Sequence, residues 1–390
     1  AGIASVTGNL TATGNVTATG NVTATGIVTA TSFVPTVGQL SHRNITINGA
    51  MNVAQRGTSS TSSGYYTVDR FKVINTGTDE SPTQAQVDVS SGTSPYTSGF
   101  RKALKVTNGN QTNGAGGGDF IWIQTVLEAQ DIANSGWNYT SNSSYVTLSF
   151  WVKSSVAQDF KGYLRSNDGT NKSYAIATGS LSADTWTKIT KTIPGHSDLQ
   201  FDNDNGHGLE INFLPFLGTD RTDGSVAEDA WVTYSSSART KDNTSTWYTT
   251  NDATFEITGV QLEVGSVATP FEHRSFGDEL ARCQRYYHRI TAGGQYGRFA
   301  NGQCTGSTES QYFVQFPVTM RAVPTFGYGG TIVGYTVDTV KTVSGNITIG
   351  NANQNTGLLT ATLSGLTAGN CVDLIANNDT TAYVEFIAEL

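Results

Sequence analysis

The sequence predicts an all-β protein with an N-terminal repeat stem, a jelly-roll β-sandwich, a short connecting helix and a C-terminal β-sandwich knob. Three observations predict this class. The 390 residues include 43 glycines, and only 14% of the chain is charged. Short β-favouring stretches alternate with Gly, Asn, Asp and Ser along most of the chain. The first segment repeats with a period of six residues, which fits a strand.

The opening segment, residues 1–40, carries no Asp, Glu, Lys or Arg, and a Gly-Asn-Val-Thr-Ala-Thr motif recurs in it between residues 8 and 32. Six is a multiple of the strand period of 2 but not of the helix period of 3.6, so only a strand keeps each residue type on one face. The apolar face of this ribbon includes Val16, Ala18, Val22, Ala24 and Val28.

Such a ribbon buries too little apolar surface to offset roughly 1–2 kcal/mol of backbone ordering per residue. The repeats are also too few for a single-chain solenoid. We therefore expect three identical chains to wind their Val and Ala faces together in a trimeric stem. The alternative is a flexible tail rich in Thr and Gly.

Residues 41–274 contain strand-like stretches divided by turn residues and no segment with a long helical period. In the stretch YVTLSFWV, Val146 and Leu148 share one face while Thr147 and Ser149 share the other. This alternation is typical of an antiparallel strand that packs on one side. The segment therefore predicts a two-sheet sandwich of jelly-roll type.

A connector helix is expected within residues 275–294. Ser275 and Asp278 form a capping pattern, and Gly293 with Gly294 ends the segment. The expected apolar stripe consists of Leu280, Cys283, Tyr287 and Ile290.

Three arginines share the opposite side of this expected helix: Arg282, Arg285 and Arg289. One interpretation is a solvated face with favourable charge near a helix C-terminus. The other is contact with acidic residues of a neighbouring copy of the chain.

Residues 295–390 form a second β region, and its length suits a small sandwich of its own. Its strand-like stretches include QYFVQFPVTM, TIVGYTVDTV, GLLTATLSGL and AYVEFIAEL.

Charge and composition argue against several classes of protein. The net charge is −8 with scattered Lys and Arg, so we expect no nucleic-acid partner. We find neither an apolar run of 18 residues nor a signal-peptide pattern, and we expect no membrane insertion. The three cysteines form no CxxC motif and leave one unpaired, so we expect free thiols made in a reducing cytoplasm.

No nucleophile, phosphate-binding or zinc-protease motif occurs, and the five histidines are not spaced as metal ligands. We therefore expect no catalytic residue, no cofactor and no bound metal. FDNDNGHG at 201–208 resembles the start of a calcium loop, but it lacks the glutamate of that motif and is expected to be a hydrated turn. Acidic loop residues could supply a glycosidase-like pair, as in any sandwich of this composition.

Aromatic residues give a more specific indication. Three pairs lie in loop-like segments rich in Asn, Ser and Thr: Trp137 with Tyr139, Trp231 with Tyr234, and Trp247 with Tyr248. An exposed ring beside amides and hydroxyls can stack on a sugar and bond its hydroxyl groups, so these six residues are candidates for glycan binding. The alternative is that they cover the ends of the sandwich or pack between chains.

Several stretches resemble a known family. INGAMNVAQRGTS, YYTVDRFKV, FWVKSS and ITGVQLEVGSVATPFEHRSFGDELARCQRYYHR are similar to the carbohydrate-binding-module-like jelly-roll region of tail fibres and other appendage proteins of tailed bacteriophages. FPVTMRAVPTF and AYVEFIAEL resemble the C-terminal β domain of the same proteins. The similarity covers residues 45–390 in pieces, and QLEVG followed by PFE and ELARCQRYY is its most specific part.

The resemblance implies a homotrimeric virion fibre, assembled in the host bacterial cytoplasm, whose outer domains meet host-surface polysaccharide. The sequence shows no separate N-terminal anchoring domain, so we expect either that the stem attaches the fibre directly to the phage tail or to another virion protein, or that the sequence is a fragment of a longer chain. The resemblance supplies no sugar-binding residues. Two alternatives remain: a purely structural or capsid-decorating fibre, and a polysaccharide-degrading tailspike.

Overall fold

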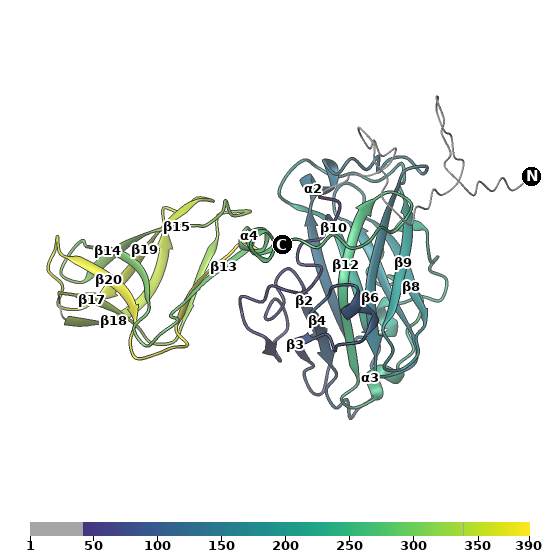
Figure 1. Cartoon of the computed structure of the whole chain (residues 1–390), viewed down its shortest axis with the longest axis horizontal. Helices are drawn as coiled ribbons and strands as arrows, with labels where there is room; N and C mark the ends of the chain where they lie inside the picture. The colour runs from purple at the N-terminus through teal and green to yellow at the C-terminus, as the bar shows by residue number, and fades with distance from the viewer. Residues whose placement is uncertain (1–41, 338) are drawn as a thin grey trace, which may run out of the picture. The chain divides into compact units, whose positions relative to one another are not determined.

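The computed structural model describes residues 42–337 and 339–390. The predicted stem, with Val16, Ala18, Val22, Ala24 and Val28, lies outside the described residues. The described chain is nearly all β, as predicted, and its strands form a two-sheet sandwich followed by a smaller β region (Figure 1).

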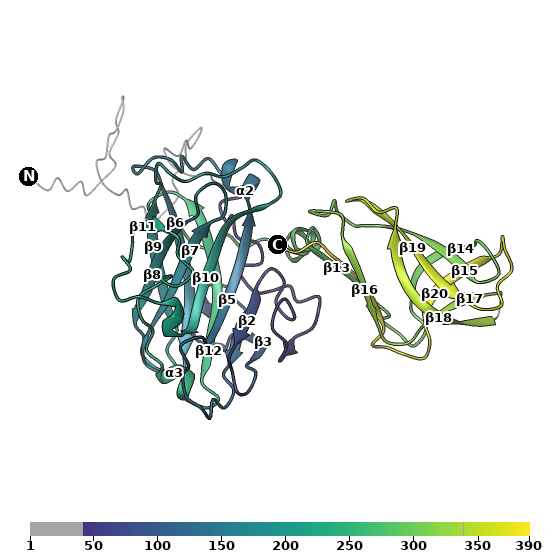
Figure 2. The ribbon, with the colours of Figure 1, turned by 180° about the vertical axis from the view of Figure 1, so that it is seen from behind.

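The sandwich consists of two six-stranded sheets, and every strand pairing within them is antiparallel. The first sheet has the order β1 (Ser59–Ser60), β3 (Thr83–Asp88), β4 (Lys102–Thr107), β12 (Thr254–Val264), β6 (Tyr145–Ser154) and β9 (Thr187–Pro194). The second has the order β11 (Trp231–Thr233), β8 (Lys172–Ser180), β7 (Asp159–Ser166), β10 (His207–Leu217), β5 (Phe120–Glu128) and β2 (Lys72–Thr76). Figure 2 shows β8, β7, β10, β5 and β2 of this second sheet side by side.

The main core lies between the two sheets. Phe150 of β6 meets Phe213 of β10 across the sandwich, with ring centroids 4.8 Å apart. The predicted alternation in β6 is confirmed on the inner face, where Val146 is fully buried. The outer face differs from the prediction, because Thr147 is also buried and its hydroxyl donates to the carbonyl of Gly265 at 2.8 Å. A later segment of the chain therefore covers this part of the first sheet.

Four short helical turns lie in the connections of the sandwich. They are α1 (Ser94–Thr97), α2 (Ala129–Ala133), the 3₁₀ turn η1 (Thr219–Arg221) and α3 (Thr246–Thr249). α1 and α2 bury Pro95 and Ile132 respectively, α3 buries two aromatic residues, and η1 buries none.

The connector helix is shorter than predicted. Helix α4 spans Phe276–Gln284, and its expected cap is confirmed: the Ser275 side chain accepts a hydrogen bond from the backbone N–H of Asp278. The expectation of helix up to residue 294 is wrong. Tyr287 and Ile290 belong to strand β13 (Tyr287–Thr291), which pairs with β21 (Tyr383–Ile387). The aromatic and β-branched run YHRIT thus finds a distant strand partner, and this tertiary pairing overrides the local helical pattern.

The C-terminal region is β, but it is not the sandwich we predicted. Strands β13, β21 and β16 (Thr325–Gly329) form a three-stranded sheet. A closed barrel follows the order β14 (Arg298–Cys304), β15 (Glu309–Gln315), β19 (Thr356–Leu363), β18 (Thr339–Gly350), β17 (Ile332–Thr336) and β20 (Cys371–Ala376). Closure pairs the edge strands with each other, which removes the open edges that a two-sheet knob would leave.

A small apolar cluster joins the last residues of the chain to the sandwich. Leu390 packs in it with Val126 of β5, with Cys283 of α4 and with Tyr286, which follows α4. Beside this cluster the buried Arg70 side chain forms an ion pair with Glu389. The segment after β21 is therefore held against the sandwich by both apolar and charged contacts.

The three thiols are free, as predicted; Cys283 and Cys304 are buried and Cys371 is exposed. Within the described residues, no helix combines the length and apolar character needed to cross a membrane.

Candidate functional site

The outer face of the second sheet carries polar residues where its strands run side by side. Alternation along β5 and β10 turns Ile123 and Ile211 into the core, so Gln124 and Asn212 face outward. Gln124 and Asn212 are direct partners in the β5–β10 register. Both are buried, and the Nε2 of Gln124 donates to the Oδ1 of Asn212 at 2.8 Å. This face is therefore covered rather than freely solvated.

The polar row continues across the neighbouring strands. The Nε2 of Gln124 also donates to the Oε2 of Glu210 at 3.1 Å. Arg165 of β7 lies opposite Glu210 in the register, with its Nη1 3.8 Å from the Glu210 carboxylate. Ser173 of β8 is the next partner of Arg165. We call Gln124, Asn212, Glu210, Arg165 and Ser173 the polar row.

Aromatic rings flank the polar row on the same face. Phe120 and Trp122 of β5 stack with their centroids 4.2 Å apart. The guanidinium of Arg239 lies 4.8 Å from the Trp122 ring, and that of Arg165 lies 4.0 Å from the ring of Tyr234. Such cation–π contacts orient both partners, so the arginines are held over the rings.

This face contains hydrogen-bonding atoms that the described chain leaves unused. The Nε1 of Trp122, the Nε of Arg165 and the Oγ of Ser173 are buried without a hydrogen-bond partner among the described residues. The same holds for the Nε of Arg239 and of Arg221, which lies 4.7 Å over Phe120. A buried polar atom left without a partner costs about 1–3 kcal/mol, but these atoms are covered by neighbouring side chains and are not open to an external ligand.

Burial shifts the acid–base behaviour of groups around this face. It raises the pKa of the Tyr163 hydroxyl, whose strand position is opposite Asn212. It lowers the pKa of Lys72 and of His207 despite the nearby Glu210 carboxylate, which raises both.

The structure places five of the six predicted glycan-binding residues away from the polar row. Trp137, Trp247 and Tyr248 are buried in the main core, so the prediction that their rings are exposed for stacking is wrong. Tyr139 and Trp231 pack at the edge of that core, and the Nε1 of Trp231 donates to the carbonyl of Pro194 at 2.7 Å. Their polar sequence neighbours lie in turns above them, while the rings turn inward.

Tyr234 is the predicted residue that does lie on the sheet face. It packs beside Phe120 and Trp122, and the guanidinium of Arg165 lies over its ring. Sequence reasoning missed Gln124 and Asn212, and it considered Glu210 only as one of the acidic residues that could form a glycosidase-like pair. The signal was present in the outward positions of FIWIQTVLEA and LEINFLPFLG, where both strands interrupt an apolar run with amide and carboxylate side chains.

The arginines predicted for inter-chain contact have partners within the chain. Arg285 forms an ion pair with Glu128 of its own chain, its Nε 2.7 Å from the carboxylate, which corrects the expectation of an acidic partner on a neighbouring copy. Arg289 belongs to β13 rather than to the helix, and its Nη1 donates to the carbonyl of Arg56. Arg282 has a hydrogen bond with His42 at 3.2 Å, and its inter-chain role stays a prediction.

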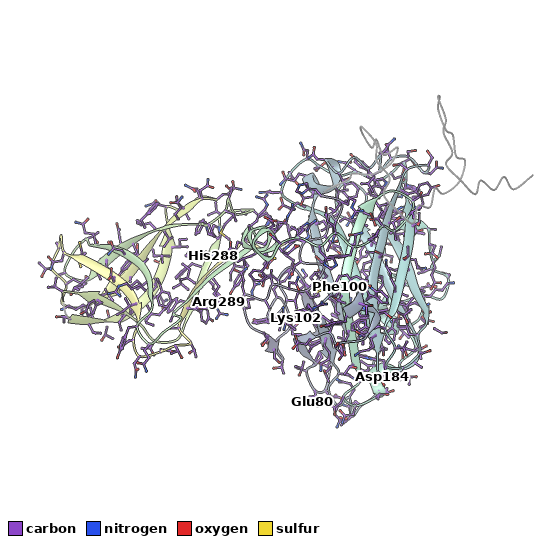
Figure 3. The ribbon with its side chains drawn as sticks, viewed as in Figure 1. Glu80, Phe100, Lys102, Asp184, His288 and Arg289 are labelled. Atoms are coloured by element: carbon purple, nitrogen blue, oxygen red, sulfur yellow. The ribbon has the colours of Figure 1, made fainter. Side chains whose placement is uncertain are left out.

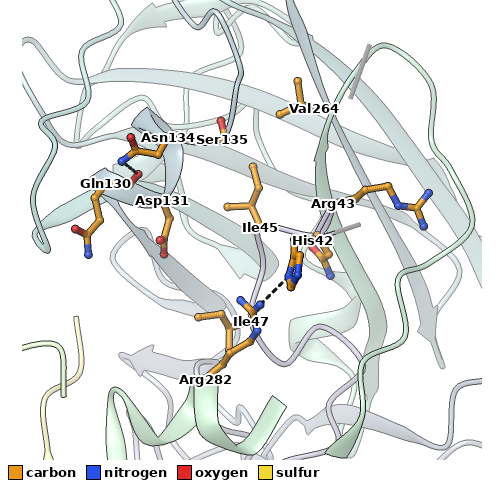
Figure 4. Close-up of a pocket in the computed structure, with 11 residues that line it drawn as sticks. His42, Arg43, Ile45, Ile47, Gln130, Asp131, Asn134, Ser135, Val264 and Arg282 are labelled. Carbon is orange, nitrogen blue, oxygen red and sulfur yellow. Dashed lines mark hydrogen bonds between the residues drawn. The ribbon is translucent and has the colours of Figure 1, made fainter. Parts of the chain in front are cut away.

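A separate cavity of about 320 Å³ lies where α2 approaches the segment that begins at His42 (Figure 4). Asp131 of α2 lines it together with the apolar side chains of Ile45 and Ile47. Burial raises the pKa of the Asp131 carboxyl to about 6, and the neighbouring Glu128 charge adds to this, against the opposing effect of Arg285.

Replacing Asp131 with Asn should stabilise the protein in a pH-dependent way. Below about pH 4 both folded and unfolded states hold the carboxyl proton, so wild type and variant should be equally stable. Between about pH 4 and 6 the folded state binds more protons than the unfolded state, so the free energy of unfolding of the wild type falls as pH rises. Asn lacks this penalty, and the variant should gain about 1–3 kcal/mol at pH 7. Urea unfolding at pH 4 and at pH 7 measures the difference in the free energy of unfolding between the variant and the wild type. An equal difference at both pH values would contradict the prediction. Asp184→Asn, at an exposed turn, is the control.

Comparisons with known proteins give remote likenesses only. No protein-family model matches the sequence, and no curated protein matches it. One similar structure is the enzymatically active domain of tailspike protein 4 from bacteriophage CBA120, with 12% identity over 57% of this chain and 21% of that chain and a TM-score of 0.31. A putative sugar-binding protein from Bacteroides thetaiotaomicron has 13% identity over 57% of this chain and 100% of that chain, with a TM-score of 0.29.

The N-terminal cellulose-binding domain of β-1,4-glucanase C from Cellulomonas fimi has 12% identity over 56% of this chain and 99% of its own, with a TM-score of 0.26. At such identities and TM-scores these likenesses carry no argument about this chain. The polar row and its neighbouring rings therefore have to be interpreted from their own chemistry.

Proposed function

We propose that this chain is a non-catalytic virion fibre protein of a tailed bacteriophage, that it acts as a homotrimer, and that it binds host-surface glycan. The sequence resemblance to phage appendage proteins supports the virion assignment. The charge-free repeat of residues 1–40 supports the trimer and its attachment to another virion protein. The proposed glycan site is the polar row with Tyr234 and Trp122.

The observation that carries the binding proposal is the Arg165 guanidinium held over the half-buried Tyr234 ring on one sheet face. A sugar offers several hydroxyls, each able to donate and accept, together with an apolar ring face. The Arg165 side chain, which is 24% exposed, offers N–H donors for the first feature, and the ring of Tyr234 matches the second. Binding at one site is expected to be weak and to be raised by three copies on one stem.

Removing the Tyr234 ring should weaken glycan binding at least tenfold, about 1.4 kcal/mol, because the ring both offers a stacking face and holds Arg165 in place. The measurement uses an array of bacterial surface glycans, followed by titration of Tyr234→Ala with the glycan that binds the wild type best. Tyr296→Ala is the matched control, since Tyr296 is an exposed tyrosine in the C-terminal region.

Equal affinity of Tyr234→Ala and wild type would remove the polar row from the proposal, and no glycan bound by the wild type would favour the purely structural fibre. Reducing ends or unsaturated sugars released from the bound glycan would favour the tailspike alternative. Light scattering of the same preparation should give three times the 41.4 kDa chain mass, and a monomer would contradict the trimer.

A further inference from the structure

A second cavity, of about 270 Å³, lies on the outer face of the first sheet. Its floor includes Ser149 and Trp151 of β6, which face outward because alternation along this strand turns Phe150 into the core. Lys188 of β9 also lines the cavity and is the direct register partner of Trp151. The volume is just below that of drug-sized sites, so it suits a ligand as small as one sugar ring. We call it the Trp151 cavity.

Three rings form one wall of the Trp151 cavity. The ring of Phe100, which Figure 3 labels, meets Phe271 edge to face, with centroids 4.8 Å apart. The His273 ring packs against both, at 5.1 Å from Phe100 and 4.9 Å from Phe271. Its Nε2 donates to the carbonyl of Ser98 at 3.0 Å. The wall is therefore held in place by contacts within the chain, as in a pre-formed binding site.

A bulge in β12 brings this wall close to the sheet. The β6–β12 register shifts between Thr258 and Gln261, so β12 holds an extra residue there. Gly259 lies in the bulge with a φ of +65°, and a Cβ at this position would come within 2.6 Å of the Phe100 ring. The backbone of Gly259 therefore lines the cavity where any other residue would displace the wall.

The cavity floor offers polar atoms that the protein does not use. Among the described residues, neither the Nε1 of Trp151 nor the Oγ of Ser149 has a hydrogen-bond partner, and neither atom is buried. The Lys188 side chain is exposed and forms no ion pair within the same part of the chain. Unlike the covered atoms beside the polar row, these three groups are therefore open to a ligand.

A sugar ring matches this combination of surfaces. Its C–H face can pack on an aromatic ring, while the hydroxyls at its edge both donate and accept hydrogen bonds. The indole of Trp151 offers a ring face, and Ser149 and Lys188 offer polar groups beside it. A wholly apolar ligand would cover these polar groups without pairing them, which costs free energy.

We propose that the Trp151 cavity binds the ring of a neutral hexose. The C–H face of the sugar packs on Trp151, and its hydroxyls bond to the Oγ of Ser149 and the Nζ of Lys188. This site lies on the opposite sheet from the polar row and does not depend on glycan binding there.

The test is saturation-transfer NMR of the full chain with the methyl glycosides of glucose, galactose, mannose and rhamnose at millimolar concentration. At least one glycoside should receive saturation, mainly on the C–H protons of one ring face, and titration gives its affinity. Trp151→Ala should weaken that binding at least tenfold. Trp151→Phe keeps a ring and should weaken it less. Tyr234→Ala, in the polar row, should leave it unchanged.

Trp186→Ala is the matched control, because Trp186 is half-buried against the same apolar cluster as Trp151 but does not line the cavity. Its affinity for the glycoside should equal that of the wild type. Thermal melting checks that each variant is folded. If Trp151→Ala fails to fold, Lys188→Ala decides the test, since this exposed side chain adds nothing to the core and its loss should weaken binding about threefold.

Three results would overturn the proposal. The first is that none of the four glycosides receives saturation. The second is wild-type affinity in Trp151→Ala or, where that variant is unfolded, in Lys188→Ala. The third is a loss of affinity in Trp186→Ala as large as in Trp151→Ala, which would show a general change of the sheet. Binding that is lost in Tyr234→Ala but kept in Trp151→Ala would place the sugar in the polar row instead.

Discussion

Replacing Trp247 with Ala should lower the free energy of unfolding by about 3–5 kcal/mol. The ring is 0% exposed, and its Nε1 donates to the carbonyl of Thr254 at 3.0 Å. Its backbone N–H donates to the side chain of Gln158, which ties α3 to the strands around it. The substitution therefore removes a large core side chain and leaves a cavity, and urea unfolding of the purified protein measures the loss.

The control for this prediction is Trp231→Ala, which removes the same side chain from the edge of the core. Trp231 is half-buried against Tyr174, so its loss should cost clearly less than that of Trp247. Glycan binding should then be compared at a temperature where both variants are folded. A Trp247→Ala variant with wild-type stability and lost binding would show that the ring serves a ligand after all.

Trp247 follows the alternative that these rings pack in the sandwich, and the reason applies to five of the six candidate rings, Tyr234 being the exception. Polar neighbours in the sequence describe the local segment, whereas burial depends on where that segment folds. In TSTWYTTND the Ser and Thr residues stay at the surface, while the short helix α3 turns Trp247 and Tyr248 inward. Tyr248 then stacks on Phe216, which is distant in the sequence. A single sequence contains no signal for such a contact.

The strand pattern was a better guide because its cause is local. Alternation in β6 places Val146 and Leu148 inward by geometry alone, and the cap of α4 depends on residues three positions apart. The end of α4 and the closure of the barrel depend on pairing with distant strands, which the local pattern does not contain. The polar row lies between these cases, since each strand shows its outward residue but only the sheet register brings Gln124 beside Asn212.

Replacing Glu389 with Ala should also cost about 3–5 kcal/mol, because it leaves the buried Arg70 guanidinium without its counter-charge. Arg70 is 1% exposed, and its guanidinium lies 3.4 Å from the centre of the Tyr286 ring. The cation can neither reach water nor lose its proton at neutral pH. Loss of the pair should also release Leu390 from its apolar cluster beside Val126. The midpoint of urea-induced unfolding should shift to a lower urea concentration. Limited proteolysis should cleave the segment after β21 faster than in the wild type.

A surface ion pair provides the matched control. Asp88 pairs with Lys102 at 2.6 Å, but the Asp88 side chain is 82% exposed, so Asp88→Ala should change stability by about 0–1 kcal/mol. In a double-mutant cycle, adding Arg70→Met to Glu389→Ala should recover part of the loss, since the unpaired charge is then absent and an apolar side chain occupies the site. If Glu389→Ala cost no more than Asp88→Ala, Arg70 would be solvated in the protein, and the charged contact would not hold this segment against the sandwich.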